Sequence, residues 1–497
     1  MTSLTPRSDS HLRRGLVCVA LLALWALATG VRWRHLHEVT LGSDALGQFL
    51  GAWTVISGGA PVPPNPEGGH SLWLWGLPCV LGGSSLEQVF AIRFALGALV
   101  APVGALAAAL LSGGRRRAWL AGALAGVVLA WDPGLVDTLV VSFRGYGAPE
   151  LISMALLGAA VGGRLGFAMG AVAFVGATGQ HPMSTGVGLG LLALLAVGKD
   201  RKHIILVAVV AGLCALPRLH WLWQLGSCGA GLFECLGNVA TGSAEPGVAA
   251  SEMLRRAFWD RGVVELGLGA SLAVLAGVVA AATHRHGRRI ALAAVLAVVG
   301  VLAIGLAIQG LRPYHLRAAM PVLVVAAAVG LSLRPAWLLV AGGCLMLGGL
   351  RWTAPLGPPG DLAAVDALGQ ALVAETGVVR VEAAWFGDPV GVEPAGVVLA
   401  ARQAGLGADQ LTVDPAAPVV LLVNLPDGEN ALSAPPRHAA LDLIARREVQ
   451  GTWVASFDTV DDARAWVAQA PTPPVVTGGS FDWVKAMLPG VGSYPPL

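Results

Sequence analysis

Apolar runs of about twenty residues recur through the first two thirds of this 497-residue chain and constrain its fold more than any other feature. A run of that length is typical of a helix that crosses a lipid bilayer. The composition agrees, because 55% of the residues are apolar and 12% are charged, and the mean hydropathy is +0.69. These values exclude an ordinary soluble protein and predict an α-helical, polytopic membrane protein.

The apolar runs predict about eleven transmembrane helices, and the distribution of Arg and Lys orients them. We expect spans at 15–31, 89–111, 118–135, 148–163, 165–181, 183–198, 203–219, 263–283, 290–308, 316–332 and 336–351. With the N-terminus in the cytoplasm, every basic cluster falls in a cytoplasmic loop, namely Arg115–Arg117, Arg164, Lys199–Lys202, Arg285–Arg289 and Arg334. We therefore expect a multi-pass protein of a bacterial-type inner or plasma membrane.

This topology places two large loops and the C-terminal segment on the outer face. The transmembrane domain covers 1–352, with outer loops at 32–88 and 220–262. From 353 to 497 helical and β-rich pieces alternate, which predicts a soluble extracytoplasmic α/β domain. Within it we expect helices at 361–376, 395–405, 437–447 and 459–469, and strands at 378–384, 419–424 and 452–457.

The first outer loop carries the strongest candidates for chemistry. Asp44 opens an amphipathic helical stretch, 44–57, that should lie along the membrane interface, and a simple N-cap is the alternative role for this carboxylate. Glu67 and His70 follow in a turn-rich segment, where a turn or cap role is again the alternative. Trp73 and Trp75 belong to an apolar segment, 71–82, which is too short to span a bilayer and which we interpret as interfacial.

Further polar residues lie at the outer ends of predicted spans, where ionisable groups are functional candidates. Glu150 follows Pro149 at a helix start, which favours a carboxylate. Asp132, in Trp-Asp-Pro, should cap a break between two helices. Arg312, His315 and Arg317 surround Pro313-Tyr314 and suit a phosphate site, although interfacial snorkelling of an arginine is the simpler alternative.

The second outer loop contains a cysteine pair and a predicted surface helix. Cys228 and Cys235 could form a disulfide if the loop faces an oxidising compartment. The helix at 249–261 is either a solvated connector or a lid. The six cysteines show no metal-type spacing, so no cofactor is assigned and a divalent cation stays open. Since no basic patch with interleaved aromatic residues occurs, we expect no nucleic-acid partner.

Five phrases together resemble the GT-C superfamily of membrane glycosyltransferases, which use polyprenyl-phosphate sugar donors. The order and spacing of the phrases carry the resemblance over roughly residues 15–351. In chain order they are GSDALGQFLGAWTVISGG, NPEGGHSLWLWGL, LGGSSLEQVFAIR, CALPRLHWLW and LRPYHLRAAMPVL. The protein O-mannosyltransferases and the lipid A aminoarabinose transferases are members of this superfamily.

The resemblance implies transfer of a sugar, with inversion, to a lipid, glycan or protein acceptor at the outer membrane face. It implies a base that deprotonates the acceptor, which we assign to Asp44, with Glu67 orienting a substrate. Glu150 is the substitute acid if the site is similar to that of the oligosaccharyltransferases. Arg312 and Arg317, with His315 nearby, would hold the leaving phosphate, and His70, Trp73 and Trp75 would belong to the substrate-binding loop.

Two other functions fit the sequence. A transporter or flippase for a lipid-linked sugar would carry polar groups in broken helices near mid-membrane, and only Gln180-His181-Pro182 indicates such a break. A non-catalytic, diverged GT-C-like scaffold is the other alternative. Asp44 is followed by Ala45 and Leu46, whereas the family usually has Asp-Glu or Asp followed by an aromatic residue.

Overall fold

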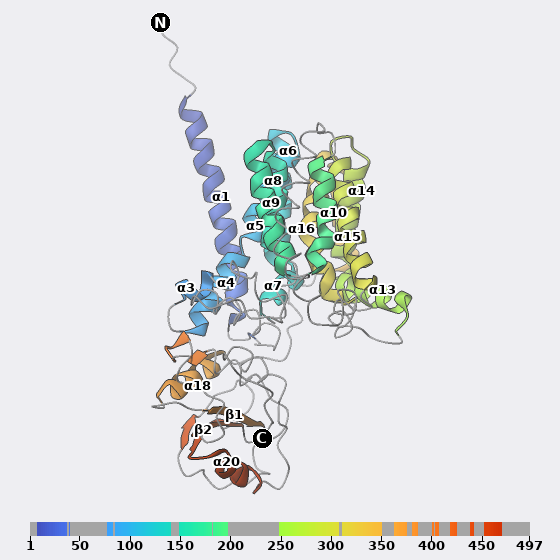
Figure 1. Ribbon diagram of the computed structural model, residues 1–497. Helices are drawn as coiled ribbons and strands as arrows, with labels where there is room; N and C mark the ends of the chain where they lie inside the picture. The colour runs from blue at the N-terminus through green and yellow to red at the C-terminus, as the bar shows by residue number, and fades with distance from the viewer. Residues whose placement is uncertain are drawn as a thin grey trace. The chain divides into compact units, whose positions relative to one another are not determined.

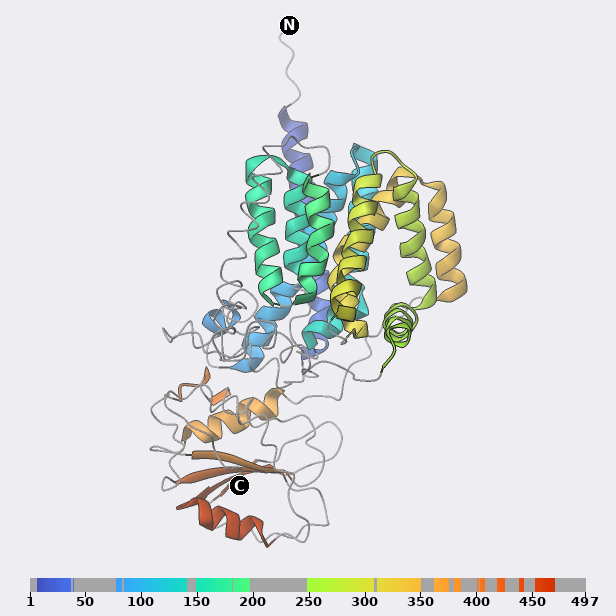
Figure 2. The same ribbon diagram turned by 45° about the vertical axis from the view of Figure 1, so that its right-hand side comes forward.

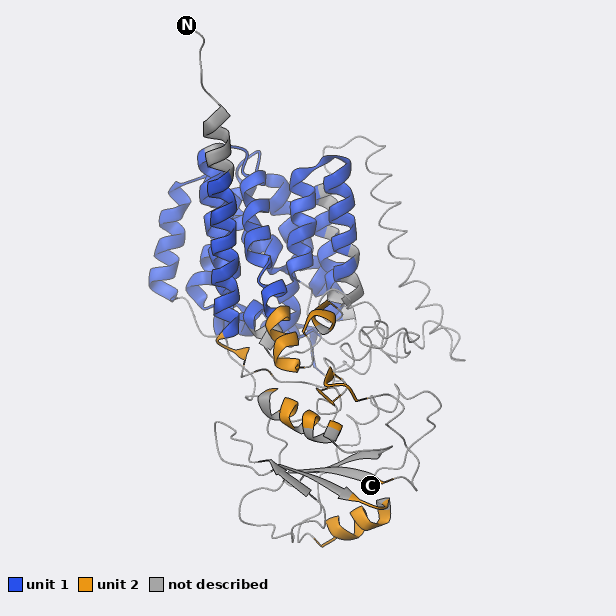
Figure 3. Cartoon of the chain, turned by 90° about the vertical axis from the view of Figure 1, so that its left-hand side faces the viewer, with its two compact units in different colours: residues 1–33, 94–139, 145–355 blue, residues 34–93, 140–144, 356–497 orange. Residues whose placement is uncertain are grey.

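The structure is a computed structural model whose described part divides into two compact units (Figure 3). Unit 1 comprises 1–33, 94–139 and 145–355, and unit 2 comprises 34–93, 140–144 and 356–497. The described residues are 7–36, 39, 77–82, 85–140, 149–180, 182–196, 248–307, 311–349, 362–374, 380–385, 400–401, 403–406, 418–424, 438–441 and 452–469.

Unit 1 is a bundle of helices that run mostly parallel or antiparallel to one another (Figures 1 and 2). In chain order its described helices are α1 (Arg7–Trp33), α5 (Val100–Leu111), α6 (Arg115–Trp131), α7 (Pro133–Val140), α8 (Pro149–Val161), α9 (Gly163–Gln180), α10 (Pro182–Ala196), α13 (Ala250–Trp259), α14 (Leu268–Ala282), α15 (Arg288–Ala307), α16 (Met320–Leu333) and α17 (Ala336–Gly348). A π-helical turn, η4 (Asp260–Glu265), follows α13, and a 3₁₀ segment, η5 (Pro313–Ala319), precedes α16.

Helix α16 is the centre of this bundle. It packs against α5, α6, α8, α14 and α15, and nearly every residue of Tyr314–Leu333 is buried. Glycines bring some helix backbones into direct contact: a Cβ added at Gly186 of α10 would lie 2.5 Å from the carbonyl carbon of Gly300 in α15. Because small residues at a contact let helix axes approach closely, these glycines favour tight packing within an apolar bundle.

Several of the helices are long and apolar enough to cross a membrane, which makes the chain an integral membrane protein. Among the described residues four pass this test: Gly15–Trp33, Leu86–Leu111, Arg288–Leu306 and Tyr314–Leu333. A fifth is added if the bent pair Ala250–Glu265 and Leu268–Ala282 forms one span. The prediction of about eleven spans is therefore wrong for the described chain, and the predicted span at 203–219 lies outside the described residues.

Breaks in the backbone explain why apolar runs do not all become spanning helices. Gly162 and Gly163 have φ values of +68° and +64°, a conformation that ends α8 at Val161 and starts α9. Helix α8 then has 13 residues, or about 20 Å at 1.5 Å per residue. That length is below the roughly 30 Å of a bilayer hydrocarbon core. Hydropathy identifies α8 and α9 as apolar segments, but the glycine turn between them determines the length of each helix.

Unit 2 contains a four-stranded sheet in the order β1-β2-β4-β3. Strands β1 (Arg380–Trp385) and β2 (Val419–Asn424) are parallel, and β4 (Thr452–Phe457) pairs antiparallel with β2 and with β3 (His438–Leu441). The described helices of this unit are α3 (Leu77–Leu81), most of α4 (Leu86–Gly97), α18 (Leu362–Ala374) and α20 (Val460–Val467).

Most described elements of unit 2 coincide with their predicted positions. The predicted strands at 419–424 and 452–457 are β2 and β4. The predicted helix at 437–447 is wrong at 438–441, because His438–Leu441 forms β3 against β4. Backbone pairing here overrides the strong helical preference of Ala439 and Ala440.

A carboxylate from α18 caps the N-terminus of α4. Asp366, which is 9% exposed, accepts hydrogen bonds from the backbone N–H groups of Leu86 at 2.9 Å and Glu87 at 3.1 Å. The hydroxyl of Ser85 also donates to Asp366, at 2.8 Å. A helix N-terminus has unpaired N–H groups and a partial positive charge, so a carboxylate there stabilises it. A side chain 280 residues further along the sequence thus fixes the start of α4.

We expect Asp366→Ala to loosen the start of α4. Loss of a helix-capping carboxylate costs about 1–2 kcal/mol, which corresponds to roughly 5–30-fold faster opening. Hydrogen–deuterium exchange of the Leu86 and Glu87 amides measures this change. Gln370→Ala, at an exposed position of the same helix, is the matched control. Unchanged exchange in Asp366→Ala would show that other contacts hold α4.

Candidate functional site

Asp132 stands at the junction between α6 and α7. Pro133 starts α7, and Asp132 Oδ1 accepts hydrogen bonds from the backbone N–H groups of Gly134 at 2.9 Å and Leu135 at 3.2 Å. Asp132 therefore caps the break, which confirms its predicted role. Its side chain is 0% exposed, so its negative charge also needs a partner inside the protein.

Arg261, at the start of the π-helical turn η4, provides this partner. Its Nη2 donates to Asp132 Oδ1 at 2.8 Å and Oδ2 at 2.7 Å, and its Nη1 donates to Glu265 Oε2 at 2.7 Å. The backbone N–H of Leu266 reaches the carbonyl of Arg261 at 3.2 Å, the five-residue bond that defines a π-turn. Such turns are rare and occur frequently at functional sites.

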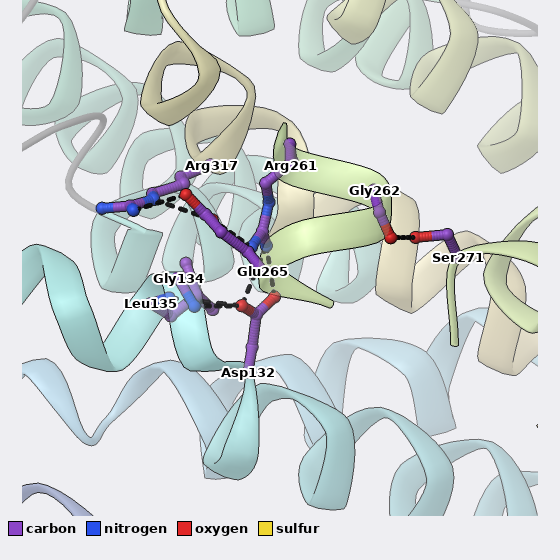
Figure 4. A network of polar contacts seen from close by, with 8 residues as sticks. All are labelled: Asp132, Gly134, Leu135, Arg261, Gly262, Glu265, Ser271 and Arg317. Atoms are coloured by element: carbon purple, nitrogen blue, oxygen red, sulfur yellow. Dashed lines mark hydrogen bonds and ion pairs between the residues drawn. The ribbon is translucent and has the colours of Figure 1, made fainter. Parts of the chain in front are cut away.

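Glu265 connects Arg261 to Arg317 of η5. Arg317 Nη2 donates to Glu265 Oε1 at 2.6 Å and its Nε donates to Oε2 at 3.2 Å, a two-point contact. We name Asp132, Arg261, Glu265 and Arg317 the ionic cluster (Figure 4). All four side chains are at most 8% exposed. Two acids and two arginines leave the cluster without net charge, which a buried site requires.

A glycine allows the backbone of α7 to approach these charges. A Cβ added at Gly134 would lie 2.6 Å from Glu265 Oε2 and would also collide with Arg261 Nη1. A larger residue at this position would separate Asp132 from Arg261. Gly134 therefore belongs to the geometry of the ionic cluster.

Two more buried charges lie within electrostatic range. Arg32 is 0% exposed and donates from Nη1 to the carbonyls of Ala28 at 2.9 Å and Ala130 at 3.2 Å. The carboxylates of Glu150 and Asp132 both stabilise its positive charge. Glu150 is 0% exposed and lies in the first turn of α8. With the ionic cluster, these described residues comprise three buried acids and three buried arginines.

The two ends of the bundle differ in charge. The ionic cluster lies at the end that holds α7, α13 and η5 (Figure 1). At the other end, Arg117, Arg285 and Arg334 lie near His284, and partial desolvation together with these positive charges lowers its pKa below the ordinary value for histidine. Arg117, Arg285 and Arg334 therefore lie at the end of unit 1 opposite the ionic cluster.

The ionic cluster offers two kinds of chemistry. Arginine presents a planar fork of donors that suits phosphate or carboxylate oxygens. Carboxylates in a water-poor environment suit proton transfer or the positioning of hydroxyl groups. Both guanidinium groups already contact carboxylates, so an incoming phosphate would have to exchange with Glu265 or Asp132. Among the described residues no group of three or more His, Cys, Asp or Glu side chains could hold a metal ion.

The described residues include only some of the predicted site. Asp44, Glu67, His70, Trp73, Trp75, Cys228 and Cys235 lie outside them. Glu150 and Arg317 are buried at the ionic-cluster end of unit 1. His315 is also buried, and its Nδ1 accepts a hydrogen bond at 3.0 Å from the backbone N–H of Arg312. Arg312 and His315 thus fix the start of η5, which carries Arg317.

Sequence reasoning missed Arg261 and Glu265. The predicted surface helix at 249–261 ends at Arg261, and Glu265 lies inside the predicted span at 263–283. An acid inside an apolar run is itself a signal, because ionisable residues at membrane depth are costly and need partners. The four-residue spacing from Arg261 to Glu265 was a second signal. Comparison with protein-family models finds no match for this chain, and comparison with curated proteins finds none either.

Proposed function

We propose that this chain is an integral membrane glycosyltransferase that moves a sugar from a polyprenyl-phosphate donor to a lipid, glycan or protein acceptor at the outer membrane face. The order of the five sequence phrases motivates the proposal. The observation that carries it is the buried ionic cluster, because Arg317 belongs to the last of those phrases and lies with two carboxylates at one end of the bundle. A donor phosphate and an acceptor hydroxyl need this combination of groups.

The proposed topology puts the ionic cluster on the outer side. Arg117, Arg285 and Arg334 lie at the opposite end of unit 1, and basic connections favour the cytoplasmic side. The N-terminus would then be cytoplasmic, and the residues after 352 would be extracytoplasmic.

In the proposed reaction Asp44 removes the proton from the acceptor hydroxyl. The acceptor oxygen attacks the anomeric carbon, the bond from that carbon to the phosphate oxygen breaks, and polyprenyl phosphate leaves with the electron pair. Glu67 orients the substrates, and Glu150 is the alternative acid. Arg312 and Arg317 stabilise the charge on the leaving phosphate through charge-assisted hydrogen bonds.

Deletion of the gene tests this function. We expect cells without the protein to lose one glycan or lipid modification and to accumulate its polyprenyl-phosphate sugar on the outer leaflet. Mass spectrometry of extracted lipids and glycans measures both changes, and re-expression of the wild-type chain is the control. If no lipid-linked sugar and no glycan changes, the proposal is wrong.

One observation favours a flippase as the second candidate. The pair α13–η4 and α14 bends by 107°, and Arg261 and Glu265 lie at the bend. Transporters use broken helices with charged groups at the break. The same deletion separates the two functions, because loss of a flippase leaves the lipid-linked sugar on the cytoplasmic leaflet, whereas loss of a transferase leaves it on the outer leaflet.

A further inference from the structure

Helix α13 has an apolar surface that is wider than the contact it makes with the bundle. Met253 and Ala257 are buried, and α13 packs against η5 and α15. At 100° per residue, Leu254 and Phe258 extend this apolar face beyond the buried edge, and Phe258 is 51% exposed. Trp259, which is 55% exposed, lies about 100° around the helix from Phe258, on the side of Arg255 and Arg256.

The direction of α13 is set by the bend that follows it. The axis of α13–η4 makes an angle of 107° with α14. Gly267, with φ of +86°, permits this bend in the backbone. Figure 2 views α13 nearly along its axis while α14 stands upright. If α14 runs along the membrane normal, α13 lies nearly in the plane of the membrane surface.

The outer face of α14 is apolar along its length. Its exposed residues recur at helical spacing: Leu268 at 48%, Leu272 at 41%, Leu275 at 58% and Val279 at 40%. Such a stripe on a membrane protein faces lipid. Because η4 joins α13 to α14, the exposed apolar residues of the two helices lie on the two sides of one bend.

The remaining face of α13 is charged. Glu252 accepts hydrogen bonds from Arg255 Nε at 2.6 Å and Arg256 Nε at 2.7 Å. These hydrogen bonds lower the pKa of Glu252 to about 2, so the carboxylate stays ionised at any physiological pH. Asp260 directly follows α13 and interacts electrostatically with Arg255. The two acids and two arginines balance one another, and this charged face suits water and polar headgroups rather than acyl chains.

We propose that α13 is an interfacial helix that binds the bilayer surface beside α14. Leu254 and Phe258 lie at the boundary between acyl chains and headgroups, and the charged face with Glu252, Arg255 and Arg256 lies toward the headgroups and water. The proposal needs only that the bundle to which α14 belongs, with α15 and α16, spans the membrane, so it does not depend on glycosyl transfer. Because η4 continues α13 directly, attachment to lipid would hold Arg261 and Glu265 at a fixed depth.

Site-specific photo-crosslinking of the full chain tests this position. The photoreactive residue p-benzoylphenylalanine replaces Phe258 on the apolar face, Arg256 on the charged face, or Leu272 in α14 as the positive control. Each variant is reconstituted in vesicles of phosphatidylcholine with radiolabelled phosphatidylglycerol and irradiated.

We expect lipid adducts at 258 and 272, with at least about fivefold less adduct at 256, because only the apolar face enters the interface. Adduct at 272 but none at 258 would overturn the proposal, as would equal adduct at 258 and 256.

Discussion

Replacing Arg261 by alanine is expected to destabilise the protein more than any other single change in the described chain. Removal of one partner from a buried ion pair costs about 3–5 kcal/mol, because the remaining charge stays buried without compensation. Here the loss leaves Asp132 without its arginine and Glu265 with Arg317 alone. The thermal unfolding midpoint of the purified protein in detergent, followed by size-exclusion chromatography after heating, measures the effect.

Two further variants separate the charge effect from simple truncation. Arg255→Ala removes an exposed arginine of the adjoining helix, and we expect no measurable change, since exposed ion pairs contribute little. The double variant Asp132→Asn with Arg261→Gln removes one charge of each sign. It should be more stable than Arg261→Ala, because no unpaired carboxylate is left at position 132. If Arg261→Ala has the same thermal unfolding midpoint as the wild type, the prediction is wrong and water reaches the ionic cluster.

The second large effect is expected at Asp44, in the proposed transferase activity. A positioned general base contributes about 10²–10⁴-fold to a rate, so Asp44→Asn should lower sugar transfer by that factor. Asparagine keeps the size and the capping ability of the side chain but cannot accept the acceptor proton. The rate at which labelled sugar leaves the lipid donor in membranes measures the change.

A matched control accompanies this variant. Glu87 is another acid of the segment 32–88, in the first turn of α4, and it has no place in the proposed reaction. Glu87→Gln should therefore keep the wild-type rate. Both variants should insert in the membrane in wild-type amounts. A fully active Asp44→Asn enzyme would remove Asp44 from the role of base and make Glu150 the next residue to replace.

Local patterns in the sequence predicted where most helices lie. The predicted spans at 15–31, 290–308 and 316–332 correspond to α1, α15 and η5–α16. They were predictable because each residue of an apolar run by itself favours burial or contact with lipid. The Trp-Asp-Pro break and the surface helix at α13 were predictable for the same reason, since capping and amphipathic spacing are local. Helix length was less predictable, because Gly162 and Gly163 stop α8 within a continuous apolar stretch.

The partners of the buried charges were not predictable. The sequence separates Arg261 from Asp132 by 129 residues and Glu265 from Arg317 by 52 residues. Each of these side chains has a plausible local role by itself: Asp132 as a cap, Arg261 as a surface residue and Arg317 as a phosphate ligand. Only the packing of α6, η4 and η5 into one end of the bundle shows that the residues neutralise one another.

By itself, the sequence determined that this is a membrane protein and which segments are apolar helices, because hydropathy and periodicity act over one or two helical turns. It also supplied Asp44, Glu67 and Glu150 as candidate acids. The tertiary structure decided that Asp132, Arg261, Glu265 and Arg317 form one ionic cluster and that Asp366 caps α4. A charge can be buried without a large loss of stability only when packing places its partner beside it. That packing depends on the whole fold.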